Sequence, residues 1–502
     1  MDVPGDTTGD GGMCAPPGIE VVAMSGDALG DLGDMLTFGT APVVGRDRTV
    51  VFRSFVGEAF IEALARRPQG MRATPITFVG DSLSTGAGSQ DVSALQGNPV
   101  VATDGSVGYQ VVLTGGDNAA FAFDPGSTTS AFLIAEGAGS AGPLGEPFVL
   151  LEPFTNRNRR TAYDGTLVFH SYFVSADPSP RITEPRGVWQ ATASTPPSVV
   201  ILDDGQPVDI PPDTATYGPA EPQVSVTSSG VIAIATGIRR APSAGFDIDR
   251  GIFRFGRSGD EQVVTAPSFT GAYVQTTLNA SGDLAYVETG PGGTGVVVES
   301  GPVAEAARDQ AVPDLPGATF VAPSAGLAYL NDGRIVFASS VEGGERDGGM
   351  GVFAQTSGGI RTLAIEGQEV PGAPGVTIAD IQTVHVNDDG GVAIRAVLAG
   401  DGVRSGFDTA ILMTTPVGDL RLMLRADTEL MVGCRNLIIQ RVSVLSDLIP
   451  GTEVELFGPG HGGLPHAITD DGAVAVHIAF VPEGAEEVEV IVLVDQPPST
   501  GT

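Results

Sequence analysis

The chain has 502 residues, 42% of them hydrophobic, with 70 glycines and 37 prolines, so it can bury a sizeable core and is rich in turns. Its formal net charge of -34 comes from 60 acidic and 26 basic residues, all of them arginine. This balance argues against nucleic acid as a partner, because a phosphate backbone requires a basic face, and no apolar run is long enough for a transmembrane helix.

The chain begins with residues 1–17, which are acidic and rich in small residues and lack the basic and apolar regions of an export signal. They resemble the tether that follows a removed signal, so we expect a secreted or cell-envelope-anchored protein. Residues 496–502 have a similar composition. We therefore expect a flexible tether over 1–17, a single folded domain over 18–495, and a flexible tail over 496–502.

Hairpins follow along most of the chain. A short apolar strand, a turn that ends in Asp-Gly or Ser-Gly, and a second apolar strand recur, because these turn residues supply the positive φ angles of tight β-turns. The turns centre on Arg48, Gly105, Gly165, Gly230, Gly282, Gly333, Gly390 and Gly472. The first copy is degenerate, with arginine in place of glycine.

The spacing of roughly 60 residues holds four strands, named A to D here, as in one blade of a β-propeller. Strands A and B form the hairpin, and strand D runs into a loop such as Gly80-Asp81 or Gly367-Gln368. We predict an all-β, eight-bladed β-propeller of four-stranded blades. Seven blades plus an irregular segment is the alternative.

The two ends of the repeat array are complementary. The chain opens on a D-type strand, Ile19–Met24, with no A, B or C strand before it. The last repeat has strand A at 465–469, strand B at 473–480 and a further strand at Val488–Val494, but no fourth. We predict that Ile19–Met24 completes the last blade beside Val488–Val494 and closes the ring.

Only two cysteines occur. Cys14 precedes the predicted closing strand, and Cys434 lies in the long segment before the last hairpin. In an exported protein a disulfide between them would hold the closing strand near the end of the ring. Two unrelated free thiols are the alternative.

The segment Phe78–Gly86 contains Gly-Asp-Ser-Leu and resembles the first block of the GDSL esterases, which would make Ser82 a nucleophile. The same repeat position holds Gly26-Asp27-Ala28-Leu29, with alanine for serine, and the Asp-x-x-His pair of that family is absent from the sequence. A serine without a nearby base is not activated. We therefore interpret the segment as a repeat loop and predict no catalytic residue.

Candidate binding residues are Arg159, Arg160, His385 and His466. The arginines precede a strand A, which lines the channel of a propeller, so they could hold a carboxylate or sulfate at its mouth; a surface ion-pair network is the alternative. The histidine spacing fits no zinc pattern. We predict no cofactor, although aspartate-rich turns such as 387–390 could hold structural calcium.

Residues 363–372 and 386–394 contain a Gly-Gln-x-x-Pro-Gly loop and an Asn-x-x-Gly-x-Val-Ala strand. This unit resembles a family of exported bacterial tandem-repeat proteins of unknown function. The resemblance is best over 310–400, and the first, fourth and fifth repeats depart from it. It implies export and a propeller, and it assigns no catalytic residue.

Together these patterns favour a non-catalytic extracellular or cell-envelope scaffold that binds a protein or glycan partner. One alternative is a polysaccharide-active enzyme with a site at the channel mouth built from Arg159, Arg160, His385 and His466. The other is a subunit of a surface layer or filament, formed by self-assembly.

Overall fold

The structure is a computed structural model, and it describes residues 15–39, 42–85, 88–102, 105–126, 129–135, 148–151, 161–163, 166–173, 186–192, 195–202, 207–210, 213–227, 229–240, 248–256, 261–263, 272–290, 293–298, 301–356, 358–415, 418–444, 455–457, 467–481 and 488–497. The regular structure in these ranges is β-strand, apart from two 3₁₀ turns at Gly30–Leu32 and Gly344–Arg346. No helix in this part of the chain could cross a membrane.

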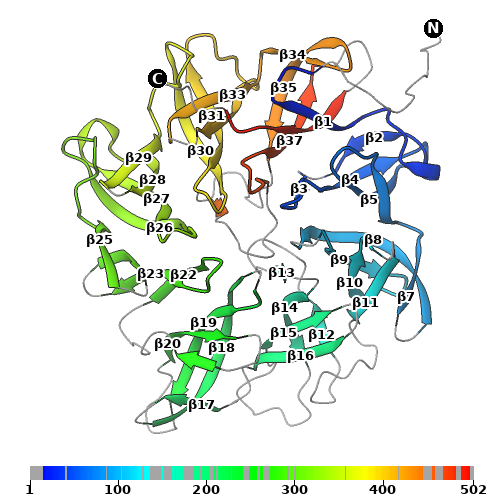
Figure 1. Cartoon of the computed structure of the whole chain (residues 1–502), viewed down its shortest axis with the longest axis horizontal. Coiled ribbons are helices and arrows are strands. Elements are labelled where there is room, and N and C mark those ends of the chain that lie inside the picture. The colour runs from blue at the N-terminus through cyan, green and yellow to red at the C-terminus, as the bar shows by residue number, and fades with distance from the viewer. Residues whose placement is uncertain are drawn as a thin grey trace.

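The described strands form eight hydrogen-bonded sheets, arranged one after another around a common centre (Figure 1). This arrangement confirms the predicted all-β propeller. We number the sheets 1 to 8 in chain order. Each sheet contains the strand that follows one of the eight predicted A–B turns, so the sheets follow the sequence repeats.

Sheets 1 to 3 contain β2 (Met35–Phe38), β3 (Val43–Val44), β4 (Val50–Val56), β5 (Ile61–Arg67) and β6 (Thr74–Phe78); β7 (Ser82–Thr85), β8 (Gly88–Val101), β9 (Val107–Leu113), β10 (Asn118–Asp124) and β11 (Thr129–Ala135); and β12 (Phe148–Leu151), β13 (Thr161–Tyr163), β14 (Thr166–Phe173), β15 (Arg186–Thr192) and β16 (Thr195–Leu202). Sheets 4 to 6 contain β17 (Pro207–Ile210), β18 (Asp213–Val226), β19 (Ile232–Arg240), β20 (Ile248–Phe255) and β21 (Glu261–Val263); β22 (Ala272–Leu278), β23 (Leu284–Gly290), β24 (Gly293–Val298) and β25 (Gly301–Ala307); and β26 (Thr319–Tyr329), β27 (Ile335–Glu342), β28 (Met350–Thr356) and β29 (Gly359–Ile365). Sheets 7 and 8 contain β30 (Val376–Val386), β31 (Val392–Gly400), β32 (Thr409–Thr414), β33 (Leu420–Arg425) and β36 (Glu455–Phe457); and β34 (Glu429–Val432), β35 (Arg435–Ser443), β37 (Val474–Phe480), β38 (Glu489–Val494) and β1 (Ile19–Met24).

The A–B turns share one backbone pattern. In sheet 6 the Gly333 amide donates to the Leu330 carbonyl (3.0 Å) and the Leu330 amide donates to the Arg334 carbonyl (2.9 Å). Gly333 has φ 83°, the left-handed conformation that such turns require at this position. Arg48 has φ 62° at the equivalent position in sheet 1, so the degenerate first copy forms the same turn.

The first side chain of these turns explains the Asn-x-x-Gly pattern. Asn387 Oδ1 accepts a hydrogen bond from the Gly391 amide (2.7 Å), and Thr469 Oγ1 accepts one from the Ala473 amide (2.8 Å). Asparagine and threonine stabilise turns in this way because their short side chains reach nearby backbone amides.

The D–A loops also share a pattern, and it accounts for the Gly-Asp-Ser-Leu segment. The Gly80 amide donates to the Val92 carbonyl, and the Val92 amide donates to the Asp81 carbonyl (both 2.8 Å). Ser82 is the first residue of β7, and its Oγ lies 2.7 Å from Ser89 Oγ on the exposed surface. Equivalent bonds occur at Gly26, Gly367, Asp309 and Asp427. The segment therefore has the geometry of a repeat loop.

The predicted ring closure is confirmed. Strand β1 pairs antiparallel with β38, with Ile19 opposite Val494 and Met24 opposite Val490, and Figure 1 shows the blue β1 beside the red end of the chain. Cys14 lies outside the described residues, so the disulfide stays a prediction. Cys434 lies in the turn between β34 and β35 of the same sheet.

Strand A of sheet 8 differs from its predicted position at 465–469. Strand β35 occupies this place instead, with Ile439 opposite Phe480 of β37, and in the described part of 465–469 only Ile468 forms a bridge, to Val474. The insertion between β35 and that bridge supplies β36, which pairs with β30 of sheet 7. Strand A of sheet 8 was therefore predicted at the wrong residues, because an insertion separates β35 from the turn before β37.

Buried apolar side chains lie between neighbouring strands and sheets. In sheet 6, Phe320, Phe337 and Phe353 are completely buried, and their ring centroids lie 4.9–5.6 Å apart. Such aromatic contacts add to the stabilisation from burial alone. The packed sheets provide a rigid support for the turns on each face of the ring.

Candidate functional site

Only one of the four predicted binding residues lies in the described structure, so the site they would form stays a prediction. Arg159, Arg160 and His466 lie outside the described residues. His385 lies in β30 and is completely buried, and its strand is covered on one edge by β36. His385 is therefore covered by the insertion of sheet 8 and does not face solvent.

A different group of polar residues meets on the face of the ring that carries the A–B turns. The group, which we call the turn cluster, consists of Arg46, Arg48, Asn331, Asp388, Asp470, Asp471 and Asp495. They come from sheets 1, 6, 7 and 8 and from the residue that follows β38.

Asp388 is the point where three sheets meet. Its Oδ2 accepts hydrogen bonds from Arg46 Nη2 of sheet 1 (2.8 Å) and from Asn331 Nδ2 of sheet 6 (3.2 Å). Arg46 Nε also lies 3.5 Å from Asp470 Oδ1 of sheet 8. Arg46 therefore reaches past sheet 8 to sheet 7, so these turns converge towards the centre of the ring.

The turns of sheets 7 and 8 are held together by a buried asparagine. Asn387 is 4% exposed, and its Nδ2 donates to the carbonyls of Thr469 (3.2 Å) and Asp470 (3.0 Å). Because the Asn387 side chain also closes its own turn, the backbone that carries Asp388 is fixed relative to the backbone that carries Asp470.

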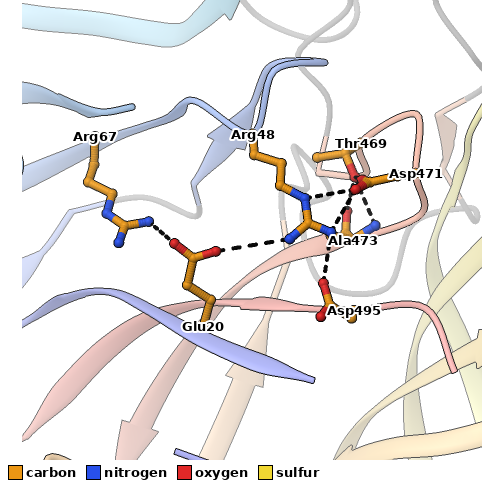
Figure 2. A network of polar contacts seen from close by, with 7 residues as sticks. All are labelled: Glu20, Arg48, Arg67, Thr469, Asp471, Ala473 and Asp495. Carbon is orange, nitrogen blue, oxygen red and sulfur yellow. Dashed lines mark hydrogen bonds and ion pairs between the residues drawn. The ribbon is translucent and has the colours of Figure 1, made fainter. Parts of the chain in front are cut away.

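Arg48 is the centre of the second half of the cluster (Figure 2). Its Nη2 lies 2.7 Å from Asp471 Oδ2 and 2.9 Å from Asp495 Oδ1, and its Nη1 lies 4.0 Å from Glu20 Oε2. Arg67 pairs with the other oxygen of Glu20. The network links β1, sheet 1 and sheet 8 across the closure of the ring.

The network changes the ionisation of its members. Burial raises the pKa of Asp471, but hydrogen bonds from Thr469 and Arg48 and the charge of Arg48 outweigh it, and the net shift is downward. Burial likewise opposes the charge of Arg48, yet Asp471 and Asp495 raise its pKa above the ordinary value. Asp471 and Arg48 are therefore both charged near neutral pH.

Carboxylates dominate what this face presents to solvent. The side chains of Asp471, Asp470 and Asp495 are 55%, 47% and 47% exposed, whereas that of Arg48 is only 19% exposed. An ionised carboxylate has about four acceptor positions, so each can accept further donors beyond its arginine partner. The cluster can therefore accept hydrogen bonds from a cationic group that arrives from solvent.

The described residues contain no group of three or more His, Cys, Asp or Glu side chains arranged for a metal ion. The turn at 387–390, considered above for calcium, directs the Asp388 carboxylate to Arg46 and Asn331 instead. The sequence patterns explain these aspartates as turn formers or as ligands of structural calcium. The other indication of a polar site in the sequence is the pair of arginines in the first turn, Arg46-Asp47-Arg48.

The model of a family described as "Family of unknown function (DUF7453)" matches residues 44–494. No curated protein matches the chain.

Three solved structures are similar to the chain over most of its length. A puromycin hydrolase is 13% identical, with 93% of this chain and 60% of that chain covered and a TM-score of 0.41. A puromycin-hydrolyzing peptidase of Mycobacterium tuberculosis is 12% identical, with 93% and 62% covered and a TM-score of 0.41. Dipeptidyl peptidase 4 of Porphyromonas gingivalis is 10% identical, with 89% and 58% covered and a TM-score of 0.41.

These comparisons correct the predicted function. The solved structures are named as a hydrolase and two peptidases, not as scaffolds, polysaccharide-active enzymes or surface-layer subunits. The chain spans only 58–62% of their length. At this level of identity the likeness concerns the fold, so neither the predicted scaffold role nor an activity of these enzymes is assigned to the chain.

Proposed function

The chain belongs to the family of unknown function DUF7453, and we propose that its ring binds a cationic organic ligand at the turn cluster. The ligand class is an amine or a guanidinium compound, such as a polyamine or an arginine-containing peptide. The observation that carries the proposal is the convergence of three half-exposed carboxylates, those of Asp470, Asp471 and Asp495. Arg46 and Arg48 hold these carboxylates in place.

Two physical features support this ligand class. The overall charge of -34 attracts cations over long range, and the turn cluster concentrates acceptors where four sheets meet. Because Arg46, Arg48 and Asn387 already fix the carboxylates, a ligand does not have to order them on binding, which favours affinity. Arg46 and Arg48 also show that guanidinium groups fit between these carboxylates.

The proposal is tested by isothermal titration with spermidine and with a tri-arginine amide at low and at physiological salt. Asp470→Asn is the informative variant, since Asp470 lies 3.5 Å from Arg46, farther than Asp471 and Asp495 lie from Arg48. We expect this variant to bind about tenfold more weakly, the loss of about one charge-assisted hydrogen bond. Binding should also weaken as salt increases.

Asp117→Asn is the matched control. It makes the same change of charge on the exposed turn between β9 and β10. This turn lies at the opposite end of β9 from the A–B turn of sheet 2. Equal binding by both variants and the unchanged protein would contradict a site at the turn cluster, as would no binding by the unchanged protein at low salt.

A further inference from the structure

The inner edge of sheet 7 is occupied by a strand from elsewhere in the chain. Strand β36 pairs with β30 in register Thr383 to Glu455, Val384 to Leu456 and His385 to Phe457. This is a parallel pairing, while every other pairing of the described strands is antiparallel. In Figure 1, β36 is the short orange strand at the inner end of β30, near the centre of the ring.

β36 does not come from the repeat that builds sheet 7. It lies in the insertion between β35 and β37 of sheet 8, and it also contacts β26 of sheet 6. Its ladder is only three residues long, and parallel pairing is slightly less stable per residue than antiparallel pairing. The strand is therefore held by few backbone bonds of its own.

The paired residues of β30 lie at the end of the strand that leads into the turn cluster. Thr383, Val384 and His385 are completely buried, and the turn that begins at Asn387 carries Asp388, the acceptor for Arg46 and Asn331. An extended chain on this edge of β30 thus ends beside carboxylates that accept cationic donors.

We propose that the inner edge of β30 at Thr383–His385 is a strand-addition site for an extended peptide, and that β36 fills it from within the same chain. This inference rests on the proposed function and narrows its ligand to a peptide with a basic group near one end. The peptide backbone replaces β36 on the edge of β30, as in other cases of strand addition, while the basic group binds the turn cluster.

The experiment measures hydrogen exchange of the Thr383–His385 amides in the full chain. Leu456→Pro removes one backbone donor of β36, and Leu456→Val, which keeps it, is the matched control. A second variant replaces residues 445–464 with a Gly/Ser linker of equal length. We expect both disruptive variants to lower the protection of the amides that face β36 about tenfold. The amides that face β31 should stay protected, and Leu456→Val should leave both sets unchanged.

The linker variant is then titrated with a synthetic peptide of residues 452–460, with and without three added arginines. Restored protection of Thr383–His385 by the tagged peptide supports the inference. Unchanged exchange in both disruptive variants, or no restoration by either peptide, would overturn it.

If the peptides restore protection but Asp470→Asn and the arginine tag have no effect, the strand-addition site stands and the proposed cationic site fails. If tri-arginine binds but no peptide restores protection, the cationic site stands and the strand-addition site fails.

Discussion

Glu489 is a buried carboxylate that joins the two ends of the chain. It accepts hydrogen bonds from Thr37 Oγ1 (2.6 Å) and the Phe38 amide (2.8 Å) of sheet 1, and His477 Nε2 of sheet 8 lies 3.4 Å away. Burial alone would raise its pKa, but these contacts with His477, Thr37 and Phe38 lower the pKa to about 2. The ionised form of Glu489 therefore stabilises the closure.

This residue predicts a pH dependence of stability. Because the pKa of Glu489 is lower in the folded state than its ordinary value of 4.5, its contribution is present above pH 4.5 and is lost as the pH falls towards 2. We expect Glu489→Gln to lower the free energy of unfolding by about 2 kcal/mol at pH 7 and by much less at pH 3. Urea unfolding at both values measures this.

Glu345→Gln serves as the control for that series, since Glu345 is exposed in a 3₁₀ turn of sheet 6, and it should change stability by less than about 0.5 kcal/mol at either pH. A Glu489→Gln effect of the same size at both pH values would contradict the role given to the ionised carboxylate.

Arg48 combines an unfavourable backbone conformation with favourable ion pairs. Its φ of 62° costs a residue with a side chain about 1 kcal/mol relative to glycine. We expect Arg48→Ala to be less stable than both the unchanged protein and Arg48→Gly, because it keeps this strain and loses Asp471 and Asp495 as partners. Arg48→Gly should be more stable than Arg48→Ala by about 1 kcal/mol. Equal thermal unfolding of the two variants would show that the left-handed turn is not retained.

At the scale of elements, β1 closes the ring by covering the edge of β38. Val21, Val22 and Ala23 of β1 are buried. Deletion of residues 1–24 should therefore cost about 3 kcal/mol or more from lost burial and should expose an edge strand that promotes association. Deletion of residues 1–13 is the control, because it leaves both Cys14 and β1 in place. Unfolding and size-exclusion measurements that do not distinguish the two deletions would contradict the closure.

The predicted Cys14–Cys434 disulfide belongs to the same element. Gly433, beside Cys434, packs against the last residue of β1, since a Cβ there would lie 3.4 Å from Met24 Cε. Non-reducing peptide mapping of the protein produced under oxidising conditions should join the peptides that contain Cys14 and Cys434. Alkylation of both thiols without prior reduction would contradict the bond.

The strands and turns were largely predictable because each repeat specifies them locally. Asp-Gly and Asn-x-x-Gly turns require left-handed glycine whatever surrounds them, and even Arg48 could be aligned by its neighbours. Asp309 and Asp427 were missed as loop positions because aspartate replaces the glycine there, with φ 64° and 67°. The position of β35 was missed because an insertion interrupts the repeat, and β36 has no repeat to be aligned with.

The candidate site forms only in the closed ring, so it could not be predicted from local sequence patterns. Arg46 and Asp388 are separated by 342 residues, and only the closed ring places them in contact. The pairing of β36 with β30, which buries His385, could not be deduced from local patterns either. The aspartates were also not recognised as a site for an organic cation, because turn formation and calcium binding already explained them.

The ring as a whole has an acidic charge, so a cation could bind anywhere on its surface, and the central claim is that it binds at one place. Hydrogen exchange of the unchanged protein with and without tri-arginine amide tests this directly. We predict slower exchange at residues 387–391 and 469–473 and unchanged exchange at the Asp117 turn. Slower exchange spread evenly over acidic turns on both faces, or none at all, would contradict a ligand site at the turn cluster.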